Sequence, residues 1–356
     1  MHPQWEKITV GELLSPMGGT LVSGNRDLLV AGLSTDSRAA RSGEIFWALQ
    51  GERYDGHDFV QKAVQSGASC VVINASHLFR LQDLLRKERF PLSPTVVTVQ
   101  DTLTALGDLA AWWRRQFEIS LVAFTGSMGK TTAKEMCGAI LQEGAKVLTS
   151  RGNYNNLIGV PLTLLRLHAG ISRVVLELGM NQFGEIGRLT QMTDPDVGVI
   201  TNVAGVHLEG VGDLKGVARA KCELIAASSS QTAIAVPVNL RVPGRHNVVN
   251  AVAASAAAFL MGAHPKEIVT GLEAFQGIKG RFAVQRLSCG VTVIDDTYNS
   301  NPEALMVALG TARSFVPPQG RLLAALGDML ELGDAACKAH NTAGEKGTSS
   351  SSKDQG

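Results

Sequence analysis

The stretch Thr125-Gly-Ser-Met-Gly-Lys-Thr-Thr132 decides the fold of this chain. It follows the apolar run 120–124, which predicts a buried strand, and it leads into the run 130–141, which predicts a helix. Glycines at such a junction let backbone N–H groups turn toward an anion, and the helix N-terminus adds its positive dipole. Although Phe124 stands where the first glycine of the general pattern would be, the strand and helix context predicts a phosphate-binding P-loop rather than a chance string in a loop.

On both sides of this segment, short apolar strands alternate with helices along most of the chain. Beyond the P-loop, strands are expected at 146–148, 173–177, 196–200, 291–294 and 321–326, and helices at 161–167, 185–192, 247–261 and 302–315. Such alternation favours a doubly wound α/β fold with a mostly parallel sheet that is covered on both faces.

The domain organisation follows from where this pattern changes. The predicted divisions are a small N-terminal α/β domain over residues 1–115, a central P-loop ATP-binding domain over 116–315, the start of a truncated C-terminal domain over 316–343, and a disordered tail over 344–356. The tail is rich in Ser, Lys and Gly and cannot bury enough apolar surface to fold.

Composition narrows the class of protein further. The 356 residues carry 33 Lys+Arg against 32 Asp+Glu, so no basic excess indicates a nucleic acid or anionic membrane as partner. No apolar run reaches the ~20 residues of a membrane span, and the first residues lack the pattern of a secretory signal. The five cysteines form no CxxC pair, which argues against a disulfide framework or a zinc site. A cytoplasmic protein is expected.

Polar residues at predicted strand ends are candidates for the chemistry. Glu177 ends one strand and His207 follows another, where open α/β sheets place their ligands, so both are candidate Mg²⁺ ligands. Lys221 and Arg281 would by default be a solvated helix residue and a turn cation. The stretch 295–302 would by default be an Asx-rich turn that caps a helix.

Read in order, these segments resemble the Mur ligases of peptidoglycan synthesis. The resemblance spans residues 8–334 and also covers Ser34-Thr-Asp-Ser-Arg38 and Asp55-Gly-His-Asp-Phe59. Its ordered motifs are TGSMGKTTAKEM, GNYNNLIGVPLTLL, LELGMNQFGEIG, ITNVAGVHLE, PGRHNVVNAVAA, GIKGRF and DDTYNSNP. Within the family, the P-loop form, the NYNN segment and Tyr-Asn-Ser-Asn-Pro are most similar to the members that add D-alanyl-D-alanine.

The resemblance implies an ATP- and Mg²⁺-dependent ligase that joins D-alanyl-D-alanine to UDP-N-acetylmuramoyl-tripeptide through an acyl phosphate, acting as a monomer. By analogy Lys130, Lys221 and His207 are catalytic, and Lys221 is carbamylated. The implied metal ligands are Thr131, Glu177, His207 and Lys221. The implied nucleotide site comprises Thr125, Gly126, Ser127, Gly129, Lys130, Thr131, Thr132, Asn247, Asn250, Arg281 and Asp296. The implied substrate site comprises Ser37, Arg38, Asn153, Asn155 and Asn156. In this comparison Asn247 and Asn250 face the adenine, Arg281 the phosphates and Asp296 the ribose.

Two departures from the family pattern keep other functions open. The central domain is shortened near 226–243, and the C-terminal domain is expected to be largely missing after 333. One alternative is therefore a weakly active or inactive remnant that only binds nucleotide or UDP-muramoyl peptide. A second is the family member that adds the third peptide residue, and a generic P-loop phosphotransferase is a more distant third.

Overall fold

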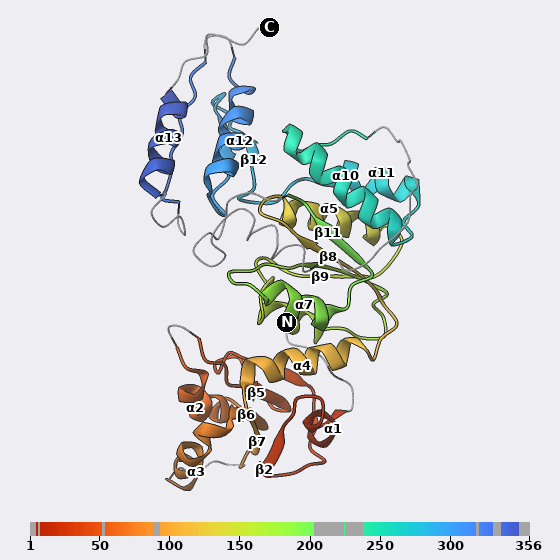
Figure 1. Cartoon of the computed structure of the whole chain (residues 1–356), viewed down its shortest axis with the longest axis vertical. Coiled ribbons are helices and arrows are strands. Elements are labelled where there is room, and N and C mark those ends of the chain that lie inside the picture. The colour runs from red at the N-terminus through yellow and green to blue at the C-terminus, as the bar shows by residue number, and fades with distance from the viewer. Residues whose placement is uncertain are drawn as a thin grey trace. The chain divides into compact units, whose positions relative to one another are not determined.

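The computed structural model describes Trp5 and residues 8–51, 54–87, 93–202, 224, 238–317, 320–329 and 336–348 (Figure 1). The chain divides into two compact units. Unit 1 comprises residues 1–119, 150–172 and 191–194, and unit 2 comprises residues 120–149, 173–190 and 195–356. No helix in the described ranges is long and apolar enough to cross a membrane.

Unit 1 is built on a sheet whose described strands follow the order β2-β7-β6-β5-β4. The strands are β2 (Thr20–Ser23), β4 (Gly32–Ser34), β5 (Glu44–Trp47), β6 (Cys70–Asn74) and β7 (Thr95–Val99), with β1 (Ile8–Thr9) and β3 (Leu29–Val30) paired separately. β4 to β7 run parallel, and β2 is antiparallel to β7. The carboxyl ends of the four parallel strands therefore meet at one edge, where ligands bind in open α/β sheets.

Helices cover this sheet and account for its continuous apolar strands. They are α1 (Val10–Leu14), η1 (Gly56–Phe59), α2 (Val60–Gln65), η2 (Ala75–His77), α3 (Leu78–Lys87) and α4 (Thr102–Arg114). Phe46, Val71 and Ile73 pack with residues of α2 and α3, and all three are almost fully buried. Strands covered on both faces have no polar side, which is why β5, β6 and β7 are buried along nearly their whole length.

The segment 150–172 belongs to unit 1, although it lies between two strands of unit 2. It contains α6 (Gly159–Leu164) and the loop before it. The indole Nε1 of Trp5 donates to the carbonyl of Leu165 at 3.1 Å, and that of Trp113 donates to the carbonyl of Leu167 at 3.1 Å. Carbonyls at a helix end lack partners within the helix, so the two tryptophans hold the end of α6 in this unit.

The P-loop sheet forms the centre of unit 2 and confirms the predicted parallel architecture. Its described strands follow the order β11-β8-β10-β9, and every pair is parallel. The strands are β8 (Ser120–Thr125), β9 (Val147–Thr149), β10 (Arg173–Glu177) and β11 (Val197–Ile200). β8 lies between β10 and β11, so the loop after it opens at the carboxyl edge with polar neighbours on both sides.

Three helices pack on one face of this sheet, and α7 (Glu185–Thr193) lies on the other (Figure 1). The three are α5 (Lys130–Gln142), α10 (Arg245–Leu260) and α11 (Pro265–Ala274). The buried side of α10 consists largely of alanines, including Ala251, Ala254 and Ala258, which let it approach α5 closely. The same side continues at the N-terminal turn with buried Asn247 and Asn250. Polar residues in such a stripe indicate a functional reason for their position.

The last described elements of unit 2 are β12 (Ala283–Arg286), β13 (Thr292–Asp295), α12 (Pro302–Arg313) and α13 (Ala336–Thr348). The predicted strand at 321–326 is wrong, because residues 320–329 form no regular element and Leu323 is 88% exposed. A strand needs a neighbour, and among the described residues β12 and β13 pair only with each other. The tail was also predicted to begin too early, since α13 continues through residues 344–348.

Candidate nucleotide and metal site

Two glycines give the P-loop its shape, between the end of β8 and the start of α5. Gly126 has φ +146° and Gly129 has φ +80°, both in the region that side chains other than glycine rarely adopt. A Cβ on Gly126 would collide with the hydroxyl of Thr201, and one on Gly129 would collide with the amide oxygen of Asn250. The loop is thus pressed against β11 on one side and α10 on the other.

Gly129→Ala should abolish nucleotide binding, because relief of the collision requires either the loop or the side-chain amide of Asn250, which lines the same cavity, to move. Gly290→Ala is the matched control, since Gly290 has φ +87° but a Cβ there would meet nothing within 4 Å. Both variants carry the ~1 kcal/mol cost of a left-handed alanine. Calorimetric titration with ATP should show binding lost only in Gly129→Ala, and equal affinity in both variants would contradict the described packing.

The functional side chains of the loop lie where the motif predicts. The Lys130 ammonium donates to the carbonyl of Gly126 at 2.7 Å, so it curls over its own loop. Burial lowers the pKa of Lys130, and the nearby charge of Glu177 opposes that change. The Thr131 hydroxyl donates to Glu177 Oε2 at 2.7 Å, and Glu177 is only 3% exposed. Hydroxyl and carboxylate oxygens at one point are the ligands that Mg²⁺ prefers.

The P-loop lines one wall of a cavity of about 340 Å³ that lies wholly within unit 2. The predicted residues that line it are Ser127, Gly129, Lys130, Thr131, Thr132, Asn247, Asn250, Arg281 and Asp296. Thr125 lies beneath the loop, where its hydroxyl donates to the carbonyl of Leu178 at 2.9 Å. Residues of three segments far apart in sequence therefore line one cavity in front of the P-loop.

Arg281 is placed to meet an anion in this cavity. Its guanidinium lies 3.5 Å from the Thr131 hydroxyl and 4.1 Å from the ring centre of Tyr298. Its Nε is buried and has no hydrogen-bond partner among the described residues. A buried N–H without a hydrogen-bond partner lowers the stability of the fold unless a ligand accepts its hydrogen bond. This geometry fits a phosphate oxygen between Arg281 and the P-loop.

Asp296 and His246 form a second polar group in the cavity. Burial raises the pKa of Asp296, although the backbone N–H of Phe282, which donates to its Oδ1 at 3.0 Å, opposes that rise. Burial lowers the pKa of His246, and Asp296 opposes that change. Phe282 has φ +52°, an uncommon conformation for a bulky residue, and such strain often lies at functional sites.

Sequence reasoning missed four residues that shape this cavity, namely Thr201, Asn202, His246 and Phe282. The Thr201 hydroxyl donates to the carbonyl of Met128 at 2.5 Å, and the Asn202 side chain accepts from the Met128 N–H at 2.7 Å. Both residues come directly after β11, next to the P-loop strand. Their position at a strand end was the signal that could have identified them.

The predicted substrate residues lie in unit 1. Ser37 is buried, and Arg38 forms a forked pair with Asp36, with distances of 2.9 and 2.7 Å. This pair holds the pKa of Asp36 at about 2. The Asn156 side chain accepts from the Gly159 N–H at 2.9 Å and caps α6, and the Asn155 N–H donates to the carbonyl of Asn153. Asn156 is thus held by the start of its helix, so only its amide N–H₂ remains to meet a substrate.

Two predicted residues, His207 and Lys221, lie outside the described residues, as does most of the shortened stretch near 226–243. Their roles as metal ligands and as catalytic residues stay predictions. So does carbamylation of Lys221. The described part of the expected metal site consists of Thr131 and Glu177.

The P-loop faces a cavity wall with the buried Asn247 and Asn250 and with Arg281, whose Nε has no hydrogen-bond partner among the described residues. This arrangement is typical of a protein that uses a nucleoside triphosphate. Family profiles match most of the chain. They describe the catalytic domain of the Mur ligase family over residues 29–114, the Mur ligase middle domain over 124–237, and the glutamate ligase domain of Mur ligases over 280–352. The chain belongs to the Mur ligase family, among the UDP-N-acetylmuramoyl-tripeptide–D-alanyl-D-alanine ligases.

Relatives of that name are similar along nearly the whole chain. The enzyme from Haemophilus influenzae is 33% identical over 95% of this chain and 82% of its own length. The one from Escherichia coli is 33% identical over 95% of this chain and 83% of its own length. A crystal structure of MurF from Acinetobacter baumannii matches with a TM-score of 0.81, 31% identity, and coverage of 95% and 83% of the two chains. MurF ligase from Thermotoga maritima in complex with ADP matches with a TM-score of 0.74, 25% identity, and coverage of 90% and 83%.

The expectation that the C-terminal domain is largely missing is wrong. The profile of that domain matches residues 280–352, so the domain begins well before the predicted start at 316. β12, β13 and α12 belong to it rather than to the central domain. The boundary was missed because strand and helix patterns continue across it without a change in composition.

Proposed function

We propose that this chain is an ATP-dependent ligase that joins D-alanyl-D-alanine to UDP-N-acetylmuramoyl-tripeptide in peptidoglycan precursor synthesis. The observation that carries the proposal is the cavity of unit 2, in which the P-loop faces Asn247, Asn250 and Arg281. The relatives named for this reaction support the choice of substrates. ATP use is further supported by the similar ligase that binds ADP.

The described residues fit a Mg²⁺-bound nucleotide. Thr131 and Glu177 would hold the ion, whose role is to neutralise charge on the phosphates. The positively charged side chains of Lys130 and Arg281 line the same cavity, Lys130 from the P-loop and Arg281 from the opposite wall. Because charge spreads over the transferred phosphoryl oxygens, these residues act by position and electrostatics rather than by covalent chemistry.

The reaction needs activation because a carboxylate repels a nucleophile. The terminal carboxylate of the tripeptide attacks the γ-phosphorus of ATP, and ADP leaves. The amine of D-alanyl-D-alanine then attacks the acyl carbon, and phosphate leaves with the former carboxylate oxygen. Lys130 is placed to hold the transferred phosphoryl group. Ser37, Arg38, Asn153, Asn155 and Asn156 are the proposed residues for the UDP-linked substrate and its carboxylate, and the enzyme is proposed to act as a monomer in the cytoplasm.

The acceptor dependence of phosphate release tests this function. With ATP and UDP-N-acetylmuramoyl-tripeptide, phosphate should form rapidly only when D-alanyl-D-alanine is added, with one amide bond per ATP consumed. Phosphate formed from the UDP-muramoyl dipeptide with lysine or diaminopimelate would instead assign the third-residue reaction. Binding of the nucleotide and the UDP-linked substrate without turnover would identify a remnant.

A further inference from the structure

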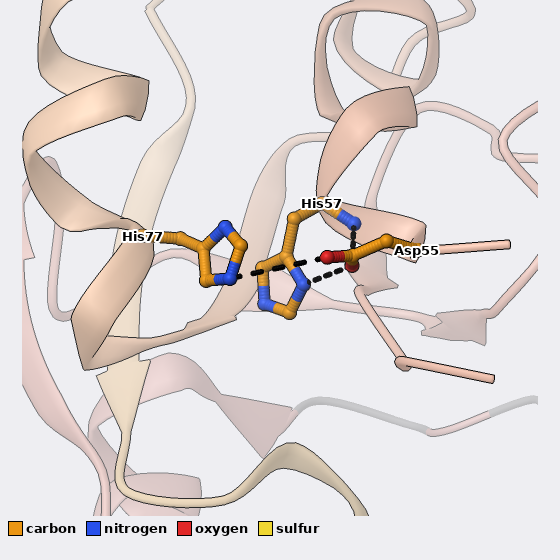
Figure 2. Close-up of side chains that lie close together, drawn as sticks. All are labelled: Asp55, His57 and His77. Atoms are coloured by element: carbon orange, nitrogen blue, oxygen red, sulfur yellow. Dashed lines mark hydrogen bonds and ion pairs between the residues drawn. The ribbon is translucent and has the colours of Figure 1, made fainter. Parts of the chain in front are cut away.

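A chain of hydrogen bonds at the carboxyl edge of the sheet in unit 1 has no role in the function proposed above. It begins at Asp55, in the loop after β5, whose carboxylate contacts the ring of His57 (Figure 2). From His57 it passes to the backbone N–H of Asn74 at the end of β6. Asn74 continues it, because its Nδ2 donates to the carbonyl of Gln100 at 2.6 Å, in the loop after β7. Loops that follow three neighbouring strands are thereby tied together through two side chains.

The contacts fix the tautomer of His57. The backbone N–H of Asn74 donates to His57 Nε2 at 2.9 Å, so Nε2 must carry a lone pair. The proton of the neutral ring therefore lies on Nδ1, which donates to Asp55 Oδ1 at 2.5 Å. The side chain of His57 is only 4% exposed. Burial works against ionisation of Asp55, but its hydrogen bonds from His57 outweigh that effect, and the pKa of Asp55 lies below its usual value.

The same tautomer argues against a metal ion at this place. Asp55, His57 and His77 bring ligand atoms within 4.8 Å of one another, as a metal site would. His57 could bind an ion through Nδ1 only if its proton moved to Nε2, where it would face the N–H of Asn74. His77 instead stacks on His57 with ring centres 3.9 Å apart, and its Nε2 lies 3.9 Å from Asp55 Oδ2.

The loops joined in this way lie at the carboxyl edge of the sheet, where open α/β sheets bind their ligands. Gly56 packs so tightly on the backbone of Leu49 that a Cβ would come within 2.7 Å of two of its backbone atoms. Gln50 and Asp55 form a bridge that closes the loop between them. The loop after β4, with Ser37 and Arg38, lies at the same edge of the sheet because β4 is parallel to β5. Backbone contacts thus hold Gly56 to Leu49 and Asp55 to Gln50, and His57 adds the tie from these residues to the end of β6.

We propose that His57 is a positioning residue for the UDP-linked substrate, which it serves by holding residues 54–57 to the ends of β6 and β7 as a neutral donor and acceptor. The proposal rests on the proposed function. His57 itself does not meet the substrate, since both ring nitrogens are already occupied.

Protonation of His57 would break the chain of hydrogen bonds. A proton on Nε2 would face the N–H of Asn74, and two donors cannot pair. Burial lowers the pKa of His57 and the charge of His77 adds to that effect, whereas Asp55 and Asp58 oppose it. Asp58 is itself paired with Arg80 at 2.8 Å. The loop is therefore intact at and above the ordinary histidine pKa of about 6.5, and it is released as the pH falls through the lowered pKa of His57.

Two variants distinguish a positioning role of His57 from a purely stabilising one. In His57→Leu both hydrogen bonds are lost, so the KM for UDP-N-acetylmuramoyl-tripeptide should rise about tenfold or more, with the KM for ATP unchanged. A glutamine amide offers one donor and one acceptor at nearly the spacing of the ring nitrogens. His57→Gln should therefore keep the KM within about threefold of the wild type. His168→Gln, at an exposed histidine of the same unit, is the control and should leave both KM values unchanged.

The pH profile of the same KM completes the test and does not require His57→Leu to fold. As the pH is lowered from 7.5 to the lowest pH at which both proteins stay folded, the KM of the wild type should rise more steeply than that of His57→Gln, because glutamine cannot take up the proton. Parallel profiles, or a folded His57→Leu with unchanged KM, would overturn the proposal. A wild type that forms no amide would instead refute the proposed function, and substrate affinity measured by calorimetry would then test His57 by the same comparisons.

Discussion

Replacement of Lys130 by alanine is expected to remove most ATP turnover, with kcat/KM for ATP lowered by about a hundredfold to a thousandfold. A lysine in a P-loop stabilises the charge that develops on the phosphoryl group, and loss of one such group typically costs about 10²–10³ in rate. Lys130 also donates a hydrogen bond at 2.7 Å to the carbonyl of Gly126 in its own loop. Steady-state phosphate release with saturating UDP-muramoyl tripeptide and D-alanyl-D-alanine measures the effect.

The fold should survive this substitution. Lys130 lies at the cavity rather than in the apolar core between α5 and α10. Burial of the ammonium lowers the pKa of Lys130, which shows that the charged form is held at a desolvation cost. The substitution by alanine relieves that cost. Thermal unfolding should shift by only a few degrees. Lys146→Ala, at an exposed lysine of the same unit, should keep both activity and stability. Normal turnover in a folded Lys130→Ala protein would refute the assignment of the P-loop.

Replacement of Glu177 by glutamine is expected to lower kcat by about a hundredfold or more and to raise the Mg²⁺ concentration needed for half-maximal activity. Glutamine can still accept the hydrogen bond from Thr131, so the packing at the end of β10 stays the same. What disappears is a buried negative charge that offsets the positive charge of Lys130 and would ligate the metal.

The dependence on Mg²⁺ distinguishes a ligand from a structural carboxylate. Activity of Glu177→Gln should recover partly as Mg²⁺ is raised, whereas a variant damaged in folding would not respond. Glu143→Gln, at the exposed end of α5, is the matched control and should behave as the wild type. A Glu177→Gln enzyme with normal rate and normal Mg²⁺ dependence would show that this carboxylate binds no metal.

The sequence predicted the parts of the site that depend on local backbone. The P-loop needs only a strand, two glycines with unusual φ values and a helix start, and all of these lie within 23 consecutive residues from Ser120 to Gln142. The resemblance added Asn247, Asn250, Arg281 and Asp296, and the structure brings all four to the same cavity. Thr201 and Asn202 were not predicted, because an uncharged threonine or asparagine at a strand end does not by itself distinguish a ligand site from an ordinary turn.

The features that escaped prediction depend on contacts between distant segments. Residues 150–172 pack in unit 1 because two indole N–H groups hold the end of α6, and no pattern within the segment reveals this. The stretch 321–326 is apolar enough for a strand but finds no neighbour among the described strands. Likewise, the resemblance covered the Asp55-Gly-His motif, whereas the tautomer of His57 became clear only from the N–H of Asn74.

Transfer of an oxygen atom from the tripeptide carboxylate to phosphate tests whether the amide forms through an acyl phosphate. UDP-N-acetylmuramoyl-tripeptide labelled with oxygen-18 in its terminal carboxylate would be converted with ATP and D-alanyl-D-alanine, and the phosphate analysed by mass spectrometry. If the carboxylate attacks ATP and phosphate then leaves from the acyl carbon, each phosphate carries one labelled oxygen and each new amide keeps the other. Unlabelled phosphate, with ATP consumed and both labels retained in the UDP-linked substrate, would contradict amide formation through an acyl phosphate.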